Sequence, residues 1–154
     1  MPSGWRIQKA RYATTAFSGE GARQYRGRWH SRGLPVVYLS SHQSLAALEV
    51  LVRTRPLTPA EEGVVIGAEW DEQLMETCRA GDLPARWRMA PPVPETIAIG
   101  DQWLREARSA VLAVPSALIP AEMNYLLNPV HPHFGRIRIG KPVPFTFDPR
   151  LLHR

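Results

Sequence analysis

Hydrophobic residues in this chain fall into short runs that are separated by turn-forming residues. Residues 5–10 alternate loosely between apolar and polar side chains, and residues 36–40 and 63–70 are rich in β-branched and apolar positions, which is typical of strands. A further apolar run at residues 110–114 ends at Pro115. These patterns predict a sheet of short strands rather than a bundle of long helices.

Two segments have the character of helices. Ser40 or Ser41 is expected to cap a helix over residues 43–53, which ends before Pro56. A second helix is predicted over residues 95–108. Two helices can cover part of a sheet, but they are too few to form a core of their own.

The remaining segments are less regular. A short helical turn is predicted over residues 121–127 and strands over residues 136–139 and 143–147, with Pro144 confining the last strand to a sheet edge. Residues 18–33 hold glycines among arginines and are expected to form a loop or hairpin. No linker divides the chain, so the sequence predicts a single α+β domain, with a largely antiparallel sheet core flanked by a few helices.

Composition narrows the class of protein. Cys78 is the sole cysteine among 154 residues, which excludes an internal disulfide and a cysteine-based zinc site. His131 and His133 resemble a sparse metal pair, but no carboxylate stands at ligand spacing, so we expect no metal. No apolar run approaches the roughly 18–20 residues of a membrane span, and the first residues lack the apolar core of a secretion signal. We therefore expect a cytoplasmic protein that makes no membrane contact.

Positive charge is concentrated in the first 33 residues, which hold seven basic side chains and one acidic one. Such a patch suits a phosphate-bearing small molecule, a nucleic acid or an acidic protein. Helix-turn-helix spacing, zinc-finger ligands and an aromatic RNA-binding signature are all missing, so direct DNA binding is not expected. A site for a small phosphate-bearing ligand and a merely solvated basic face remain the two interpretations.

Glu49 is the first candidate for chemistry. The helix predicted over residues 43–53 is apolar on nearly every face, which is typical of a buried helix, and Glu49 is its only ionisable residue before Arg53. A carboxylate in such a place needs a partner or a function, because burying an unpaired charge is costly. Glu49 is therefore either one half of a structural salt bridge or a site carboxylate. Tyr38, on the preceding strand, is expected to lie close to it.

Arg28, Trp29 and Ser116 are further candidates. Glycines beside Arg28 allow an anion to approach the backbone closely, and its guanidinium can hold a phosphate through two hydrogen bonds. Trp29 is either a core residue or a stacking surface. Ser116 follows a strand without the surroundings of a nucleophile elbow, so we reject it as a hydrolase nucleophile and keep it as a hydrogen-bond donor in a cleft.

Six blocks of sequence resemble the RES-domain family, which is named for an arginine, a glutamate and a serine. Each block is weak alone, but their order and spacing are specific and together they cover almost the whole chain. The blocks are Gly-Glu-Gly-Ala-Arg (19–23), Gly-Arg-Trp (27–29), Gly-Leu-Pro-Val-Val-Tyr (33–38), Leu-Ala-Ala-Leu-Glu-Val-Leu (45–51), Val-Pro-Ser (114–116) and Asn-Tyr-Leu-Leu-Asn-Pro (124–129).

The resemblance implies a fold similar to that of the ADP-ribosyltransferases and NAD+ as the substrate. Members of this family are toxins of bacterial type II toxin–antitoxin pairs that degrade NAD+ by hydrolysis or phosphorolysis, and some are reported to ADP-ribosylate a protein. The implied partner is an antitoxin with an Xre-type helix-turn-helix domain. A homodimer within the toxin–antitoxin complex is left open.

By the same resemblance, the family's functional residues fall on Arg28, Tyr38, Glu49 and Ser116. Arg28 suits the pyrophosphate, Glu49 the ribose and its developing positive charge, and Tyr38 the nicotinamide ring. Ser116 is expected to hold the ribose, the nicotinamide amide or Glu49 itself. The expected substrate-binding set is completed by Trp29 and Asn124. One position departs from the family: the residue after Gly-Arg-Trp is commonly asparagine, and here it is His30.

Two other classes of function stay open at this stage. One is an ADP-ribosyltransferase that uses NAD+ to modify a protein, because hydrolysis and transfer differ only in what attacks the ribose. The other is a catalytically silent module that only binds an antitoxin. The presence of Arg28, Tyr38 and Glu49 together favours an enzyme.

Overall fold

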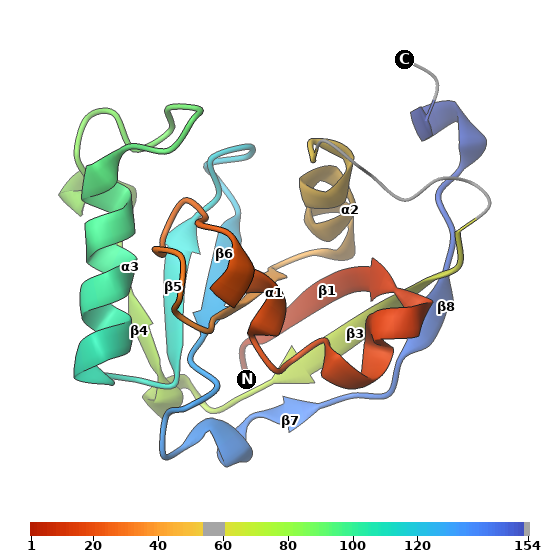
Figure 1. The fold of residues 1–154 in the computed structure, drawn as a ribbon, viewed down its shortest axis with the longest axis horizontal. Coiled ribbons are helices and arrows are strands. Elements are labelled where there is room, and N and C mark those ends of the chain that lie inside the picture. Colours follow the sequence, from red (N-terminus) through yellow and green to blue (C-terminus); the bar gives the residue numbers. More distant parts are fainter. Residues whose placement is uncertain (54–60, 153–154) are drawn as a thin grey trace.

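The computed structural model describes residues 1–53 and 61–152. One sheet runs through the molecule in the order β4-β5-β6-β2-β1-β3-β7, and β8 also pairs with β3 (Figure 1). Within the described residues, β4 and β5 are parallel and all other pairings are antiparallel. The strands are β1 (Ser3–Lys9), β2 (Val37–Ser40), β3 (Gly63–Glu69), β4 (Met75–Thr77), β5 (Val111–Pro115), β6 (Met123–Leu127), β7 (Arg138–Ile139) and β8 (Val143–Phe145). The predicted α+β class and largely antiparallel sheet are confirmed.

Three helices accompany the sheet in the described part of the chain: α1 (Glu20–Gln24), α2 (Gln43–Leu51) and α3 (Pro94–Glu106). None of the helices among these residues is long and apolar enough to span a membrane. Short 3-10 turns complete the connections, at Ala10–Thr15, Glu72–Leu74, Ala80–Asp82, Phe134–Arg136 and Pro149–Leu152.

Helices α2 and α3 pack on the same face of the sheet but over different halves of it (Figure 1). Trp103 and Leu104 of α3 pack against Leu112 and Leu126 of β5 and β6. Ala46, Val50 and Leu51 of α2 pack instead with Ile7 and Val65, which lie on β1 and β3.

The stretch of sheet between the two helices is where a ligand can reach it. Tyr38 lies opposite Leu126, and Asn124 lies opposite Ser40, so these side chains share the face that carries α2 and α3. Strands β1 and β2 pair only through Trp5 and Ser40 in the described register. The two strands therefore diverge beside Tyr38.

Two predicted elements are wrong in type. Residues 20–24, within the stretch expected to form a loop or hairpin, are the short helix α1. The helical turn expected over residues 121–127 is the strand β6, which pairs with β2 on one side and β5 on the other. Tyr125, Leu126 and Leu127 are all buried in this central strand. A strand that is covered on both faces shows no apolar–polar alternation, and its leucines have high helix propensity, so the local pattern indicated the wrong element.

The expected burial and capping of α2 are also wrong. Leu48 is 39% and Val52 59% exposed, because α2 covers the sheet with one face only and leaves the other open. The residue before the helix is His42, which makes no side-chain cap, and Ser41 instead accepts a hydrogen bond from the backbone N–H of Met123 through Oγ. The helix ends at Leu51, and Pro56 lies outside the described residues.

The segment between α1 and β2 is fixed by an unusually close approach to α3. Gly100 has no Cβ, and one placed there would lie 1.6 Å from the carbonyl oxygen of Trp29. The next residue, Asp101, accepts hydrogen bonds from the backbone N–H of Ser31, at 2.8 Å, and from its hydroxyl. Residues 29–31 are thus attached to the helix by backbone contact and by a buried carboxylate.

Gly100→Ala is expected to lower the free energy of unfolding by at least about 2 kcal/mol, because a backbone clash cannot be relieved by a change of rotamer. Urea denaturation measures the loss. Gly81→Ala is the matched control, since a Cβ there would meet nothing within 4 Å. Equal stability of the two variants would show that α3 and the segment at residues 29–31 can separate at little cost.

Candidate active site

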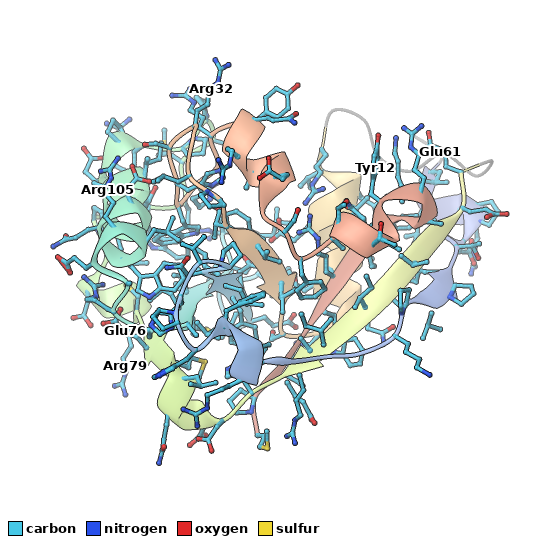
Figure 2. The ribbon with its side chains drawn as sticks, turned by 60° about the horizontal axis from the view of Figure 1, so that its bottom comes forward. Tyr12, Arg32, Glu61, Glu76, Arg79 and Arg105 are labelled. Carbon is cyan, nitrogen blue, oxygen red and sulfur yellow. The ribbon has the colours of Figure 1, made fainter. Side chains whose placement is uncertain are left out.

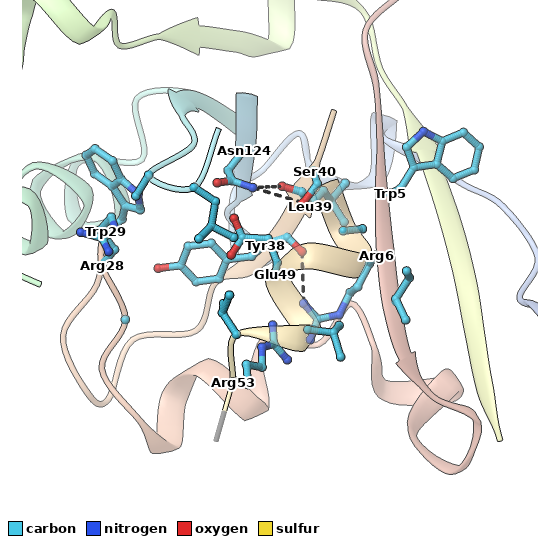
Figure 3. Close-up of a pocket in the computed structure, with 17 residues that line it drawn as sticks. Trp5, Arg6, Arg28, Trp29, Tyr38, Leu39, Ser40, Glu49, Arg53 and Asn124 are labelled. Carbon is cyan, nitrogen blue, oxygen red and sulfur yellow. Dashed lines mark hydrogen bonds between the residues drawn. The ribbon is translucent and has the colours of Figure 1, made fainter. Parts of the chain in front are cut away.

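A cleft of about 290 Å³ opens between α2, the diverging strands β1 and β2, and the segment that carries Arg28 (Figure 3). Apolar residues such as Ile7 and Val50 line it together with polar ones. The polar side chains that line it are Arg6, Arg28, Tyr38, Ser40, Glu49, Arg53 and Asn124. The predicted residues Arg28, Tyr38, Glu49 and Asn124 therefore meet in one place, from four different segments of the chain.

Glu49 lies on the face of α2 that borders this cleft and is half-buried. Burial raises the pKa of its carboxyl group above the ordinary 4.5, although Arg53, Asn124, Arg28 and Ser116 each act to lower it. Among the described residues, Glu49 forms no ion pair of the kind that Arg108 makes with Glu76. The structure thus favours the interpretation of Glu49 as a site carboxylate over a structural salt bridge.

Arg28 is held by the backbone of the segment before α3. Its Nη1 donates hydrogen bonds to the carbonyl oxygens of Trp87, at 2.9 Å, and Met89, at 2.7 Å. Burial lowers the pKa of the guanidinium, while the nearby Glu49 acts to raise it. Neither Nε nor Nη2 bonds to the part of the chain that the structure describes. That edge of the guanidinium has the two parallel donors that suit a phosphate.

Tyr38 lies between Arg28 and Glu49 at the centre of the cleft (Figure 3). The prediction that Tyr38 and Glu49 lie close together is supported, since both line the cleft and the Glu49 carboxylate acts to raise the pKa of the Tyr38 hydroxyl. Burial raises the pKa of the Tyr38 hydroxyl well above its usual range, so the phenol stays protonated at physiological pH. Its hydroxyl contacts Nδ1 of His30 at 2.6 Å.

Of the other predicted residues, Ser116 does not line the cleft, whereas Asn124 and Trp29 do. Ser116 is fully buried, and its Oγ accepts hydrogen bonds from the backbone N–H groups of Leu118 and Ile119, at 3.1 Å each. Asn124 donates to Ser40 Oγ at 3.2 Å. Ser116 and Asn124 both interact with the Glu49 carboxylate, which favours its ionised form. Trp29 is 2% exposed and packs in the core, which leaves little of its ring for stacking on a ligand.

Two arginines of the cleft were missed by sequence reasoning. Arg6 donates from Nη1 to the carbonyl oxygen of Tyr38, at 3.1 Å, and its buried Nε has no partner in the described structure. Burial and the neighbouring Arg53 lower the pKa of Arg6 to about 10. On sequence alone, Arg6 is an ordinary outward-facing strand residue and Arg53 an ordinary helix end, so no local signal distinguishes them.

Five of the seven basic side chains of the N-terminal patch form two groups in space, and Lys9 and Arg11 belong to neither. Arg6 and Arg28 line the cleft, whereas Arg23, Arg26 and Arg32 line a separate and more open depression beside α1. Arg32 projects into solvent, away from the body of the molecule (Figure 2). The cleft thus has its own positive charge, which is independent of the second group.

His131 and His133 lie together at the surface, with ring centroids 5.3 Å apart, and Nδ1 of His131 accepts a hydrogen bond from the backbone N–H of His133. No carboxylate or thiol joins them: within residues 1–53 and 61–152, no group of three or more metal-ligating side chains forms. The cleft itself contains one carboxylate, which is not the donor set of a divalent cation.

Three guanidinium groups line the cleft together with a carboxylate that makes no ion pair with the described residues. The arginines suit a diphosphate, and the carboxylate suits hydroxyl groups or a positive charge on the same molecule. The aromatic ring of Tyr38 suits a planar group. The arrangement is therefore suited to a ligand that carries phosphate groups, hydroxyl groups and a planar ring.

Comparison with known proteins identifies the family of the chain. Residues 3–148 match the RES domain, and the chain belongs to the RES-domain family. It is 38% identical over 148 residues to a protein of Yersinia enterocolitica named "Toxin Res", covering 96% of this chain and 97% of the relative. It is 32% identical to the "Prs ADP-ribosylating toxin" of a Sphingobium species, covering 97% and 96%.

The fold has also been seen in a solved structure. The crystal structure of the M. tuberculosis MbcT–MbcA toxin–antitoxin complex contains a chain that superposes with a TM-score of 0.76 at 16% identity. The match covers 94% of this chain and 84% of that one. At this level of identity the likeness concerns the fold alone.

Glu49→Gln is expected to raise Tm at neutral pH. A carboxyl group whose pKa rises on folding destabilises the folded state when it is ionised, so the penalty is complete above the folded pKa. The penalty is absent well below 4.5, where the group is protonated in both states, so the gain in Tm should vanish there. Thermal unfolding across this pH range measures it, with the exposed Glu72→Gln as control. A lower Tm for Glu49→Gln at neutral pH would mean that Glu49 makes a net stabilising ion pair.

Proposed function

We propose that this chain is the toxin of a type II toxin–antitoxin pair and that it degrades NAD+ by cleaving the bond between nicotinamide and ribose. The observation that carries the proposal is the Glu49 carboxylate. It is half-buried, forms no ion pair with the described residues, and borders the same cleft as Arg6, Arg28 and Arg53. The relatives named as Res toxins over nearly their full length support the toxin role.

The reaction is a substitution at the anomeric carbon of the ribose. The carbon–nitrogen bond breaks, its electron pair stays with nicotinamide, and positive charge develops on the ribose. Water or phosphate then attacks the same carbon. When water attacks, it loses a proton and the products are nicotinamide, ADP-ribose and H+. A fixed carboxylate beside the ribose stabilises that charge only as it forms, which accelerates the reaction.

Each group of the cleft has a place in this scheme. Glu49 bonds a ribose hydroxyl and opposes the developing charge, with Ser116 and Asn124 holding its carboxylate. Arg28 offers the Nε and Nη2 edge to the pyrophosphate, and the Tyr38 ring lies against nicotinamide. In this scheme the unpartnered Nε of Arg6 is a further donor for the pyrophosphate, beyond the residues that the sequence predicted.

The second candidate function is ADP-ribosylation of a protein. It is favoured by the relative named "Prs ADP-ribosylating toxin", which matches 97% of this chain. The same cleft and the same bond cleavage serve both reactions, because only the attacking nucleophile differs. A catalytically silent module is disfavoured, since burial of Glu49 without an ion pair is costly and has no purpose in a protein that only binds a partner.

The partner that we propose is an antitoxin with an Xre-type helix-turn-helix domain, in an assembly that leaves room for a homodimer of this chain. The solved toxin–antitoxin complex of similar fold supports an antitoxin. The positive cleft attracts an acidic or carboxylate-ended segment as readily as a pyrophosphate. We therefore expect the antitoxin to place such a segment in or over the cleft near Arg28.

Incubation of the purified chain with NAD+, with and without phosphate, tests the reaction. Mass spectrometry should find nicotinamide together with ADP-ribose or its phosphorylated form, and the phosphate dependence identifies the acceptor. Glu49→Gln should lower kcat by ~10²–10³, the usual cost of one lost transition-state contact. Glu72→Gln should have no effect. Intact NAD+ in both incubations would overturn the proposal and bring protein ADP-ribosylation forward, which a labelled-NAD+ transfer assay detects.

Arg28→Lys is expected to be damaging although it keeps the charge. Lysine can replace neither the two bonds to the Trp87 and Met89 carbonyls nor the planar pair of donors on the ligand side. Losing a hydrogen bond to a charged group should weaken kcat/KM by about tenfold or more. Arg32→Lys, in the open depression outside the cleft, is the control. Unchanged kinetics for Arg28→Lys would assign the pyrophosphate to Arg6 and Arg53.

A further inference from the structure

His30 lies behind the cleft and does not line it, yet it makes the closest polar contact to the hydroxyl of Tyr38. The imidazole is 2% exposed. Its Nδ1 lies 2.6 Å from Tyr38 Oη, and its Nε2 lies 2.8 Å from the carbonyl oxygens of both Ala22 and Tyr25. Every polar atom of the ring is therefore engaged by a neighbour from the α1 segment or from β2.

The partners of His30 fix where its hydrogen lies. Carbonyl oxygens only accept hydrogen bonds, so Nε2 must carry the hydrogen that it shares between Ala22 and Tyr25. In the neutral ring Nδ1 then has a free lone pair and can only accept. Tyr38 must consequently donate its single hydroxyl hydrogen to His30, away from the ligand.

The surrounding backbone holds the imidazole in this position. A Cβ on Gly27 would lie 2.7 Å from Cε1 and 2.8 Å from Nδ1 of His30, and 3.0 Å from the hydroxyl oxygen of Tyr38. Gly27 also donates its backbone N–H to the carbonyl oxygen of His30, at 3.0 Å. The residue that follows His30 is attached to α3 through Asp101. The pair formed by His30 and Tyr38 is thus built into the fold.

We propose that His30 is a positioning residue that takes up the single hydrogen of the Tyr38 hydroxyl and so fixes the direction of this hydroxyl. The phenol can then donate no hydrogen bond to a ligand, and its oxygen, which also interacts with the backbone of Trp29, can act only as an acceptor. The proposal rests on the proposed function for its kinetic test. The state of the imidazole can be tested without any substrate.

The substrate-free test is nitrogen NMR of the full chain labelled in its histidines. The signals of His30 are those that disappear in His30→Asn. We expect a protonated nitrogen at Nε2 and an unprotonated one at Nδ1. A protonated Nδ1 would reverse the hydrogen bond to Tyr38 and overturn the proposal, whether or not the protein cleaves NAD+.

The kinetic test compares His30→Asn with His30→Leu. The two replacements have nearly the same size, but only asparagine keeps an oxygen close to the place of Nδ1. We expect His30→Leu to lower kcat by roughly tenfold, as befits one lost hydrogen bond, and His30→Asn to keep most of the activity. The surface variant His133→Leu, which is exposed, controls for loss of a histidine as such.

Repeating the pair of substitutions in a Tyr38→Phe background separates positioning from structural support. Without the hydroxyl, asparagine and leucine at position 30 should give the same rate. A difference that persists in this background, or equal rates for the two variants in the native background, would overturn the proposal. If both variants at position 30 unfold, the nitrogen NMR measurement decides alone. The His30 signals are then assigned as those that shift in Tyr38→Phe, and a protonated Nδ1 would contradict the proposal.

Discussion

The contact between the backbone of Trp29 and Gly100 of α3 determines where the cleft lies. Arg28 and His30 flank Trp29, and neither belongs to a helix or a strand of its own. Their positions are set because the carbonyl group of Trp29 packs directly on Gly100 of α3, which has no side chain. Asp101 then accepts a hydrogen bond from the backbone N–H of Ser31. The anchored segment lies against α3, which covers one half of the sheet. Helix α2, which carries Glu49, covers the other half. The cleft is the space between them.

The charges of the cleft suit a bound ligand, but they lower the stability of the protein when no ligand is present. Burial and the charge of Arg53 lower the pKa of Arg6, and burial acts against the charges of Arg28 and Glu49 as well. A chain selected only for stability would pair these groups directly or replace them by apolar residues. A bound diphosphate next to a ribose would supply the missing counter-charge and hydrogen bonds.

The sequence predicted those parts of the site in which residues that are close in space are also close along the chain. Tyr38 and Glu49 lie on a strand and the helix that directly follows it, so their proximity could be predicted from the pattern. Arg6 comes from β1, which lies beside β2 only after the sheet has formed, and nothing near it in the sequence distinguishes it. Strand β6 was missed for a related reason: its identity as a strand comes from partners on both sides rather than from its own residues.

The divergence of β1 from β2 has a consequence for how mutations at position 6 are interpreted. In a continuous sheet the carbonyl oxygen of Tyr38 would receive a backbone N–H from the neighbouring strand. Here the Arg6 side chain takes that role, while its buried Nε has no partner among the described residues. Arg6 therefore has two roles: its guanidinium donates a hydrogen bond to a strand carbonyl, and the residue also lines the cleft. Truncating Arg6 would therefore leave a backbone carbonyl unsatisfied and also remove a ligand contact. A loss of activity would combine both effects, and separate measurements of stability and of ligand binding are needed to tell them apart.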